Sequence, residues 1–298
     1  MKKKYILLMG SPKCGTTSIY DFLSKSQYIS CYHSKEPNFF ATDISNISSK
    51  YKNNLDSDNA FMLDGTTSYL RSDTFISKIN SLKGDLYLFL FRRNYLNQII
   101  SIYGQLSKSR TQSDLSKILI NDWNEIKENK ISPQNILHTA ATAKHFLSKI
   151  DFYIQNKTYL FYFDRYITDS EVVNQEICNF LSISDLNCSE LSHKNTGIFY
   201  KPSRIFNIAN TLYSMKNRLR IPSFGMMGLI RNIFGSIEGR PDLSQDAKKV
   251  LLEFYKSEQI ALQQIIKLWN NTNDDKFFNS WSAEISNYLA SISSSTTS

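Results

Sequence analysis

The sequence predicts an α/β protein of one domain, with a central parallel sheet flanked by helices and a helical C-terminal part. Short apolar segments alternate with segments of helical periodicity as far as Ser203, and the pattern is helical only after that residue. Strands that alternate with helices form parallel sheets with right-handed crossovers. A chain of 298 residues with 41% hydrophobic content can bury one sizeable core. We assign residues 1–290 to this domain and the Ser- and Thr-rich residues 291–298 to a disordered tail.

Apolar runs that end at turn-forming or charged residues predict the strands. The predicted strands are Tyr5–Met9, Phe61–Leu63, Asp85–Arg93 and Thr158–Phe163. The third has a fully apolar centre, which is typical of a central parallel strand. Helical spacing of apolar residues predicts helices over Thr17–Ser26, Asn94–Leu106, Leu115–Glu128, Pro133–Ile150, Glu171–Leu181, Ser244–Tyr255 and Glu258–Trp269.

The charge balance favours an anionic partner. The chain has 35 basic and 27 acidic residues, a formal net charge of +8, so anionic lipid, acidic glycan or a polyphosphorylated cofactor would be attracted. No basic block beyond Lys2–Lys4 supports a nucleic-acid tail, and we expect no nucleic-acid partner. The apolar stretch Tyr5–Met9 is too short for a signal peptide, and no window approaches the roughly 18 apolar residues of a membrane span. We therefore expect a cytoplasmic chain.

The segment Leu7–Leu23 combines the end of a strand, a glycine-bearing turn and the start of a helix. Ligands of open parallel sheets bind beyond the carboxyl ends of the strands, where a helix N-terminus offers unpaired N–H groups to an anion. Thr16 and Thr17 would add hydroxyl donors. A nucleotide-triphosphate loop places Lys directly after its last Gly, whereas here Lys13 precedes Gly15. The loop therefore predicts an anion site without a magnesium site.

This segment, GSPKCGTTSIYDFL, resembles the loop G-x-x-K-x-G-T-T/S-x-L of sulfotransferases that use 3′-phosphoadenosine 5′-phosphosulfate (PAPS). The resemblance implies a P-loop-like sulfotransferase fold, sulfuryl transfer from PAPS and no required metal. It also implies that the loop binds the 5′-phosphosulfate through Pro12, Lys13, Cys14, Gly15, Thr16, Thr17 and Ser18.

A second segment, RNYLNQIISIY, is similar to the part of the family that binds the 3′-phosphate, where an Arg ends a central strand and a Ser follows eight residues later. Arg93 and Ser101 have this spacing, and a guanidinium with a hydroxyl suits a dianionic phosphate. Tyr95 replaces a common Pro, and Gln98 replaces a frequent second Arg. Neither change removes the predicted anion site.

A third segment, HKNTGIFYKPSR, resembles the loop that closes over the nucleotide. The resemblance implies close backbone approach, contact with adenine and added charge near the 3′-phosphate. The implied cofactor contacts are Gly197, Phe199, Tyr200 and Lys201. The segment YLFYFDRYITD resembles the fourth strand of the family and its acidic turn, for which we expect a structural role.

The general base is sought in HSKEPNFF, which resembles the K-E-x-x-F-F segment of glycan sulfotransferases, including those that act on heparan sulfate. The resemblance implies that Glu36 deprotonates the acceptor while Lys13 neutralises the departing phosphate. His33 is the reserve base, because relatives that sulfate phenols and steroids use a His. The nearby segment LDGTTSYL is similar to the family pattern E-K-x-x-x-Y-F/L. Asp64 and Tyr69 match it, but Gly65 replaces the Lys that supplies a second cation.

Several alternatives stay open at this point. The preferred acceptor is a hydroxyl of a carbohydrate or glycoconjugate, and a small molecule or lipid with His33 as base is the alternative. A P-loop phosphotransferase, or kinase, would need a Gly-Lys-Ser/Thr ending and an acid such as Asp64 for magnesium. A membrane-surface module is a different class, since residues 204–234 mix basic and large apolar side chains. We expect this stretch to form partly core and partly an acceptor-side lip with possible peripheral membrane contact.

Overall fold

The computed structural model describes residues 3–32, 34–41, 61–80, 84–106, 114–189, 241–269 and 275–295. The chain divides into two compact units. The first comprises Met1–Tyr95, Thr139–Lys194 and Leu252–Ser298, and the second comprises Leu96–His138 and Asn195–Leu251.

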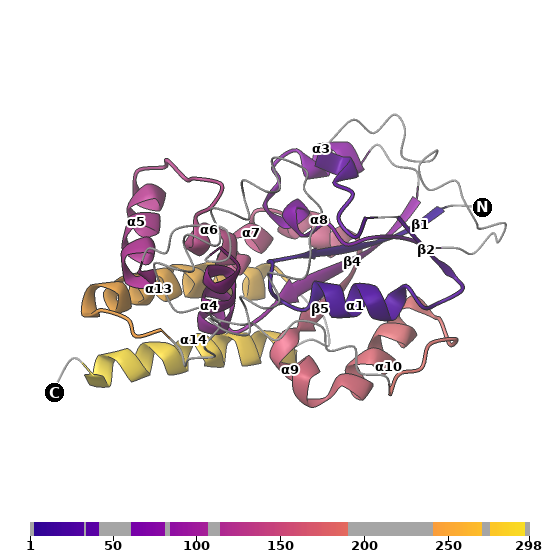
Figure 1. Cartoon of the computed structure of the whole chain (residues 1–298). Coiled ribbons are helices and arrows are strands. Elements are labelled where there is room, and N and C mark those ends of the chain that lie inside the picture. Colours follow the sequence, from indigo (N-terminus) through magenta and orange to yellow (C-terminus); the bar gives the residue numbers. More distant parts are fainter. Residues whose placement is uncertain are drawn as a thin grey trace, which may run out of the picture. The chain divides into compact units, whose positions relative to one another are not determined.

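The first unit contains a parallel sheet of five strands in the order β2-β3-β1-β4-β5 (Figure 1). This sheet, flanked by helices, confirms the predicted α/β class. The strands are β1 (Lys3–Gly10), β2 (Ile29–Cys31), β3 (Phe61–Asp64), β4 (Gly84–Arg92) and β5 (Lys157–Tyr162). Four of them were predicted, and the three-residue β2 was missed.

The register of the central strands determines where the site lies. Leu7 of β1 is paired with Asp64 of β3 and with Leu88 of β4, and Gly10 is paired with Phe91. The carboxyl ends of β1, β3 and β4 therefore lie at the same edge of the sheet. The loops that follow these three strands begin at this edge, which is where open parallel sheets bind ligands.

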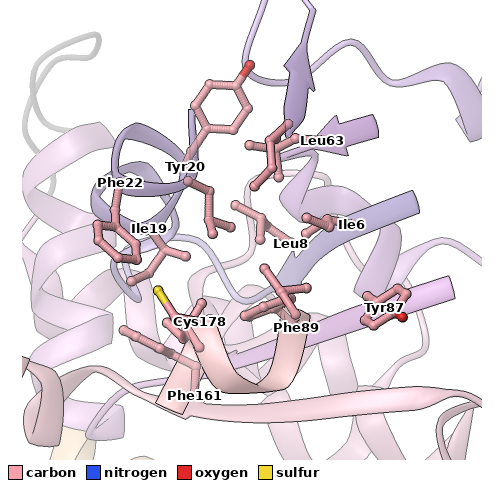
Figure 2. Close-up of a cluster of buried hydrophobic side chains, with 14 of the residues drawn as sticks. Ile6, Leu8, Ile19, Tyr20, Phe22, Leu63, Tyr87, Phe89, Phe161 and Cys178 are labelled. Carbon is pink, nitrogen blue, oxygen red and sulfur yellow. The ribbon is translucent and has the colours of Figure 1, made fainter. Parts of the chain in front are cut away.

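One face of the sheet is buried by α1 (Thr16–Leu23) and α10 (Ser170–Leu181). Ile6 and Leu8 alternate along β1, and with Phe89 of β4 they pack with Ile19 and Cys178 of the two helices in one cluster, as Figure 2 shows. Figure 1 shows α9 (Phe163–Thr168) on this side of the sheet, and α3 (Phe75–Ile79) and α8 (Ile150–Gln155) on the other.

Two helix predictions are wrong. Residues 133–150 do not form one helix: α6 (Ile136–Ala140) and α7 (Thr142–Leu147) are separate, and α8 follows at Ile150. Ala141 has ψ 62°, outside the helical range, and this breaks the pattern. In the C-terminal part, the two predicted helices are one helix, α13 (Gln245–Leu268), because no Gly or Pro interrupts residues 256–257.

The remaining elements of the first unit are the 3₁₀ turns η1 (Phe39–Ala41) and η3 (Thr67–Arg71) and the long helix α14 (Asp275–Ser295). The helix continues five residues into the stretch expected as a tail, because extending an existing helix needs no new nucleus. None of the helices in the described part of the chain is long and apolar enough to cross a membrane. Residues 204–234, for which membrane contact was expected, lie outside the described residues.

A buried polar network joins β4 to the C-terminal helices within the first unit. Arg92 lies 3.1 Å from a carboxylate oxygen of Glu284 and stacks over Tyr162 at 3.9 Å. The hydroxyl of Tyr95 donates to Glu258, which also accepts from the N–H of Ala143 at 2.8 Å. Burial raises the pKa of Glu258 to about 7. These residues hold the end of β4 against α13 and α14.

The second unit contains most of α4 (Tyr95–Leu106), together with α5 (Leu115–Lys127). Asp114 caps α5 by accepting from the N–H of Ser116 at 2.9 Å. Asp122 of the same helix is buried and accepts the N–H of Ile136 at 2.6 Å. Burial raises the pKa of Asp122 to about 6. The unit is thus held by side-chain acceptors at helix ends.

Candidate functional site

The loop Ser11–Gly15 connects β1 to α1 at the carboxyl edge of the sheet. Gly15 caps α1 with φ 87°, a left-handed conformation that favours glycine. A Cβ at Gly15 would also overlap the ring of Phe163. The tight turn leaves the first N–H groups of an eight-residue helix at the sheet edge. Such a helix start suits an anion.

Side chains of the loop take different roles. Ser11 is buried, and its hydroxyl lies 2.6 Å from that of Thr142. Cys14 is fully buried in the core cluster, and burial strongly raises the pKa of its thiol. Its side chain therefore packs inward, so any contact with a ligand is left to its backbone. Lys13 is half-buried, and its backbone has φ 69°.

Arg93 is attached to this loop. Its guanidinium donates to the carbonyl of Lys13 at 3.2 Å and stacks over the ring of Phe163 at 4.8 Å. Nε of Arg93 is buried without a hydrogen-bond partner among the described residues. The carboxylate of Asp164 accepts the N–H of Asn94 at 2.7 Å, so the acidic turn after β5 has the expected structural role. Ser101, the other predicted 3′-phosphate ligand, is half-buried on α4 in the second unit.

The segment Lys35–Glu36 lies beside the same loop. Nζ of Lys35 donates to the hydroxyl of Thr16 at 3.0 Å and lies 3.1 Å from Oε1 of Glu36. Oε2 of Glu36 accepts from the hydroxyl of Thr67 at 3.4 Å. The side chains of Lys35 and Glu36 are 21% and 41% exposed. The predicted base is therefore accessible to solvent and linked through one ammonium group to the predicted anion loop.

The end of β3 supports this segment. Asp64 is buried and accepts from the N–H of Thr66 and from the hydroxyl of Tyr69, both at 2.9 Å. Thr66 in turn accepts the N–H of Asn38 at 3.1 Å. Burial raises the pKa of Asp64 to about 6, and the negative charge of Glu36 adds to this rise. Both oxygens of Asp64 are thus engaged by the protein, which makes this residue a structural support for the loop that carries Glu36.

Arg71 is a cation near this site that the sequence analysis missed. Its guanidinium donates to the hydroxyl of Thr139 at 2.9 Å, and its Nε is buried without a partner among the described residues. Burial lowers the pKa of Arg71, and the nearby carboxylate of Glu36 opposes this change. The sequence did contain a signal for Arg71, because it follows Tyr69 by two residues. This spacing places both residues in the same short turn at the sheet edge.

Five predicted site residues cannot be placed. His33, Gly197, Phe199, Tyr200 and Lys201 lie outside the described residues. Within the described part of the chain, the structure brings together Lys13, Thr16, Glu36 and Arg93 around the end of β1 through the contacts above. It adds Lys35, Thr67 and Arg71 to them.

No family model and no curated protein matches the sequence. A sulfotransferase from Alicyclobacillus acidocaldarius matches the structure with a TM-score of 0.58 and 14% identity, over 91% of this chain and 100% of that chain. At such identity the similarity shows a shared fold. The protein therefore has the α/β fold of sulfotransferases.

Two further solved structures are more distant. Mouse sulfotransferase SULT7A1, solved with PAP, has a TM-score of 0.44 and 8% identity, over 95% of this chain and 88% of that chain. A sulfotransferase domain from the curacin biosynthetic pathway has a TM-score of 0.40 and 11% identity, over 85% and 96%.

Proposed function

We propose that the protein is a sulfotransferase that uses PAPS as its sulfuryl donor. The observation that carries this proposal is the link between the loop after β1 and the carboxylate of Glu36: the ammonium of Lys35 contacts both Thr16 and Glu36, at 3.0 and 3.1 Å. An anion bound at the start of α1 would then lie within reach of a base. A transferase that moves an anionic group to a hydroxyl needs this arrangement.

The proposed reaction is an in-line transfer. An acceptor oxygen forms a bond to sulfur while the bond between sulfur and the bridging oxygen of the 5′-phosphate breaks, and the electron pair stays with that phosphate. Glu36 takes the proton of the acceptor hydroxyl. Lys13 neutralises the negative charge that grows on the leaving phosphate, which accelerates the reaction because the interaction is strongest in the transition state.

The donor would be held at both ends. The backbone N–H groups and hydroxyls of residues 11–18 bind the 5′-phosphosulfate in this proposal. In the same proposal Arg93 and Ser101 are the ligands of the 3′-phosphate. Nε of Arg93 has no hydrogen-bond partner among the described residues, which supports a role in anion binding. The nucleotide would be covered by Gly197, Phe199, Tyr200 and Lys201.

The proposed acceptor is a hydroxyl of a carbohydrate or glycoconjugate. The support is the Glu36 segment, whose carboxylate is 41% exposed and therefore open to a large acceptor. A phenol or lipid hydroxyl deprotonated by His33 is the other possibility. A panel of sugars, glycolipids and phenols, incubated with the protein and ³⁵S-labelled PAPS, separates these acceptor classes.

Two measurements test the donor. Calorimetry should detect binding of adenosine 3′,5′-bisphosphate (PAP), and labelled PAPS should lose its sulfonate to an acceptor or, slowly, to water. Folded protein that binds neither PAP nor PAPS would contradict the proposed function. Binding of adenosine triphosphate with magnesium in preference to PAP would favour a phosphotransferase instead.

A further inference from the structure

Two cysteines lie close together at the C-terminal end of α10. Sγ of Cys178, in the last turn of the helix, lies 3.6 Å from Sγ of Cys188, and the structure holds both as unlinked thiols. Cys178 is buried in the core cluster, where Figure 2 labels it. Cys188 is half-buried and packs against the edge of that cluster. Neither thiol takes part in the proposed sulfuryl transfer.

The backbone holds Cys188 beside the helix independently of its sulfur. Ser182 follows the end of α10 with φ 55°, a left-handed conformation, and the N–H of Ile183 donates to the carbonyl of Cys178 at 3.0 Å. The side-chain amide of Asn174 donates to the carbonyl of Cys188 at 2.9 Å. Asn174 and Cys178 are four residues apart and therefore lie on one face of α10. Cys188 is thus held on this face both through its carbonyl and beside a second sulfur.

We propose that Cys178 and Cys188 form a redox modification site, at which a small-molecule disulfide such as oxidised glutathione introduces a reversible intramolecular disulfide. The sulfurs of a disulfide are about 2.0 Å apart. Small rotations of the two side chains close the remaining gap, because the backbone already places both residues side by side. The site is separate from the proposed transfer and does not depend on it.

The bond forms by two exchange steps. Cys188, the more accessible of the two, attacks one sulfur of the small disulfide, so that a mixed disulfide forms and one small thiol leaves. The sulfur of Cys178 then attacks the sulfur of Cys188 and releases the second small thiol. The protein loses two electrons and the two thiol protons, and the small disulfide gains them as two thiols.

The second step should be the slow one. The thiolate is the attacking form of a cysteine. Burial, together with the neighbouring thiol of Cys188, raises the pKa of Cys178 to about 12. Little of Cys178 is therefore ionised at neutral pH, and we expect oxidation to take minutes to hours.

The new bond would lock a segment that holds the end of α1. Asp185 lies between the two cysteines in the chain, and its carboxylate accepts from the hydroxyl of Ser26 at 2.9 Å and from the N–H of Gln27 at 2.8 Å. Ser26 and Gln27 follow α1 directly. A link that closes residues 178–188 into a loop restricts the unfolded chain. The oxidised protein should therefore resist unfolding better than the reduced protein.

Thiol counting and peptide mass spectrometry test the site. Cys31→Ser removes the exposed cysteine and leaves three of the four. After hours with oxidised glutathione, the folded variant should show one thiol in denaturant in place of these three. A digest without reductant that cuts the chain at Asp185 should yield two peptides joined through Cys178 and Cys188.

Thermal unfolding measures the effect on stability. The midpoint of the oxidised Cys31→Ser variant should rise by about 3 °C or more. Dithiothreitol should restore both thiols and the original midpoint. Cys31→Ser combined with Cys188→Ser is the matched control, because it removes the more accessible partner. It should keep its two remaining thiols, and oxidised glutathione should leave its midpoint unchanged.

The contrary outcomes are distinct. Absence of thiol loss, a disulfide to Cys14, or a stable glutathione adduct on Cys188 without the internal bond would each overturn the proposed site. An equal rise of the midpoint in the control would do the same. If Cys188→Ser unfolds, Cys188→Ala replaces it. These measurements involve neither PAPS nor PAP, so their failure would leave the proposed function intact.

Discussion

Lys13 has a backbone conformation that is unfavourable for a residue with a side chain. Its φ of 69° lies in the left-handed region, which costs about 1–2 kcal/mol for L-residues. The guanidinium of Arg93 holds this conformation by donating to the carbonyl of Lys13 at 3.2 Å. Strain at this loop supports the role that we propose for Lys13.

The strain leads to a prediction about stability and turnover. Lys13→Gly should abolish most PAPS turnover and yet unfold at a higher temperature than Lys13→Ala, because glycine accepts positive φ without cost. A difference of about 1 kcal/mol corresponds to about 2–4 °C for a chain of this size. Calorimetric melting of both variants, together with labelled PAPS, measures the two effects. Near-normal turnover in either variant would remove Lys13 from the mechanism.

A substitution of Glu36 separates nucleotide binding from the chemical step. Glu36→Gln keeps the size of the side chain and an oxygen that can accept from Thr67, but it cannot take a proton. Sulfuryl transfer should fall by about a hundredfold or more while PAP affinity stays within about twofold. Glu128→Gln, at a side chain 61% exposed, is the control. Transfer that persists in Glu36→Gln would move the base to His33.

At the scale of elements, the end of β4 shows how strand geometry assigns roles. Successive side chains of a strand point to opposite faces. Arg92 therefore shares a face with Leu88 and Leu90 and is buried against Glu284, whereas Arg93 is directed to the loop after β1. Two adjacent arginines with the same charge thus differ in role. The first stabilises the fold, and the second lies at the loop for which we propose anion binding.

This difference gives a prediction for Arg93→Ala. PAP binding should weaken about tenfold to a hundredfold, and binding of adenosine 5′-monophosphate, which lacks the 3′-phosphate, should weaken much less. Titration calorimetry with both nucleotides measures the ratio. Equal weakening of the two would mean that Arg93 acts only by holding the carbonyl of Lys13.

The sequence predicted those elements whose apolar pattern is long or whose loop chemistry is specific. The central strands, α1, α4, α5 and α10 were found. The structure places Lys13, Thr16, Glu36 and Arg93 at one sheet edge, and their roles in the site stay predictions. β2 was missed because three residues are too short for a periodicity. Arg71 was missed because the 3₁₀ turn that places it has no apolar repeat. The break at Ala141 depends on one backbone angle, which composition does not reveal.

At the scale of the whole molecule, buried carboxyl groups make stability depend on pH. Burial raises the pKa of Glu258 to about 7 and that of Asp64 to about 6. A raised pKa means that the folded state binds more protons than the unfolded state between about pH 4 and 7. The stabilisation is fully present below the unfolded pKa and is lost as the pH rises through the folded pKa. The free energy of unfolding should therefore fall over this range.

Glu258→Gln tests this dependence. Each such group contributes a slope of up to about 1.4 kcal/mol per pH unit within its window, so the variant should lose less stability between pH 5 and 8 than the unmodified protein. Urea unfolding at several pH values measures how the free energy of unfolding changes with pH. Glu128→Gln, at an exposed carboxylate, should leave the slope unchanged, and an equal slope in all three proteins would contradict the assignment to Glu258.

The contact between Gly65 and the Lys35 segment limits which residues related proteins can carry at these two positions. Any side chain at residue 65 would press on the backbone and the stem of Lys35, with separations of 3.0 and 2.9 Å at its first atom. A related protein with a lysine at residue 65 must therefore move or lose the lysine at residue 35. Most related chains should therefore carry a cation at residue 35 or at residue 65, and few should carry one at both. Substitutions at the two positions should occur together.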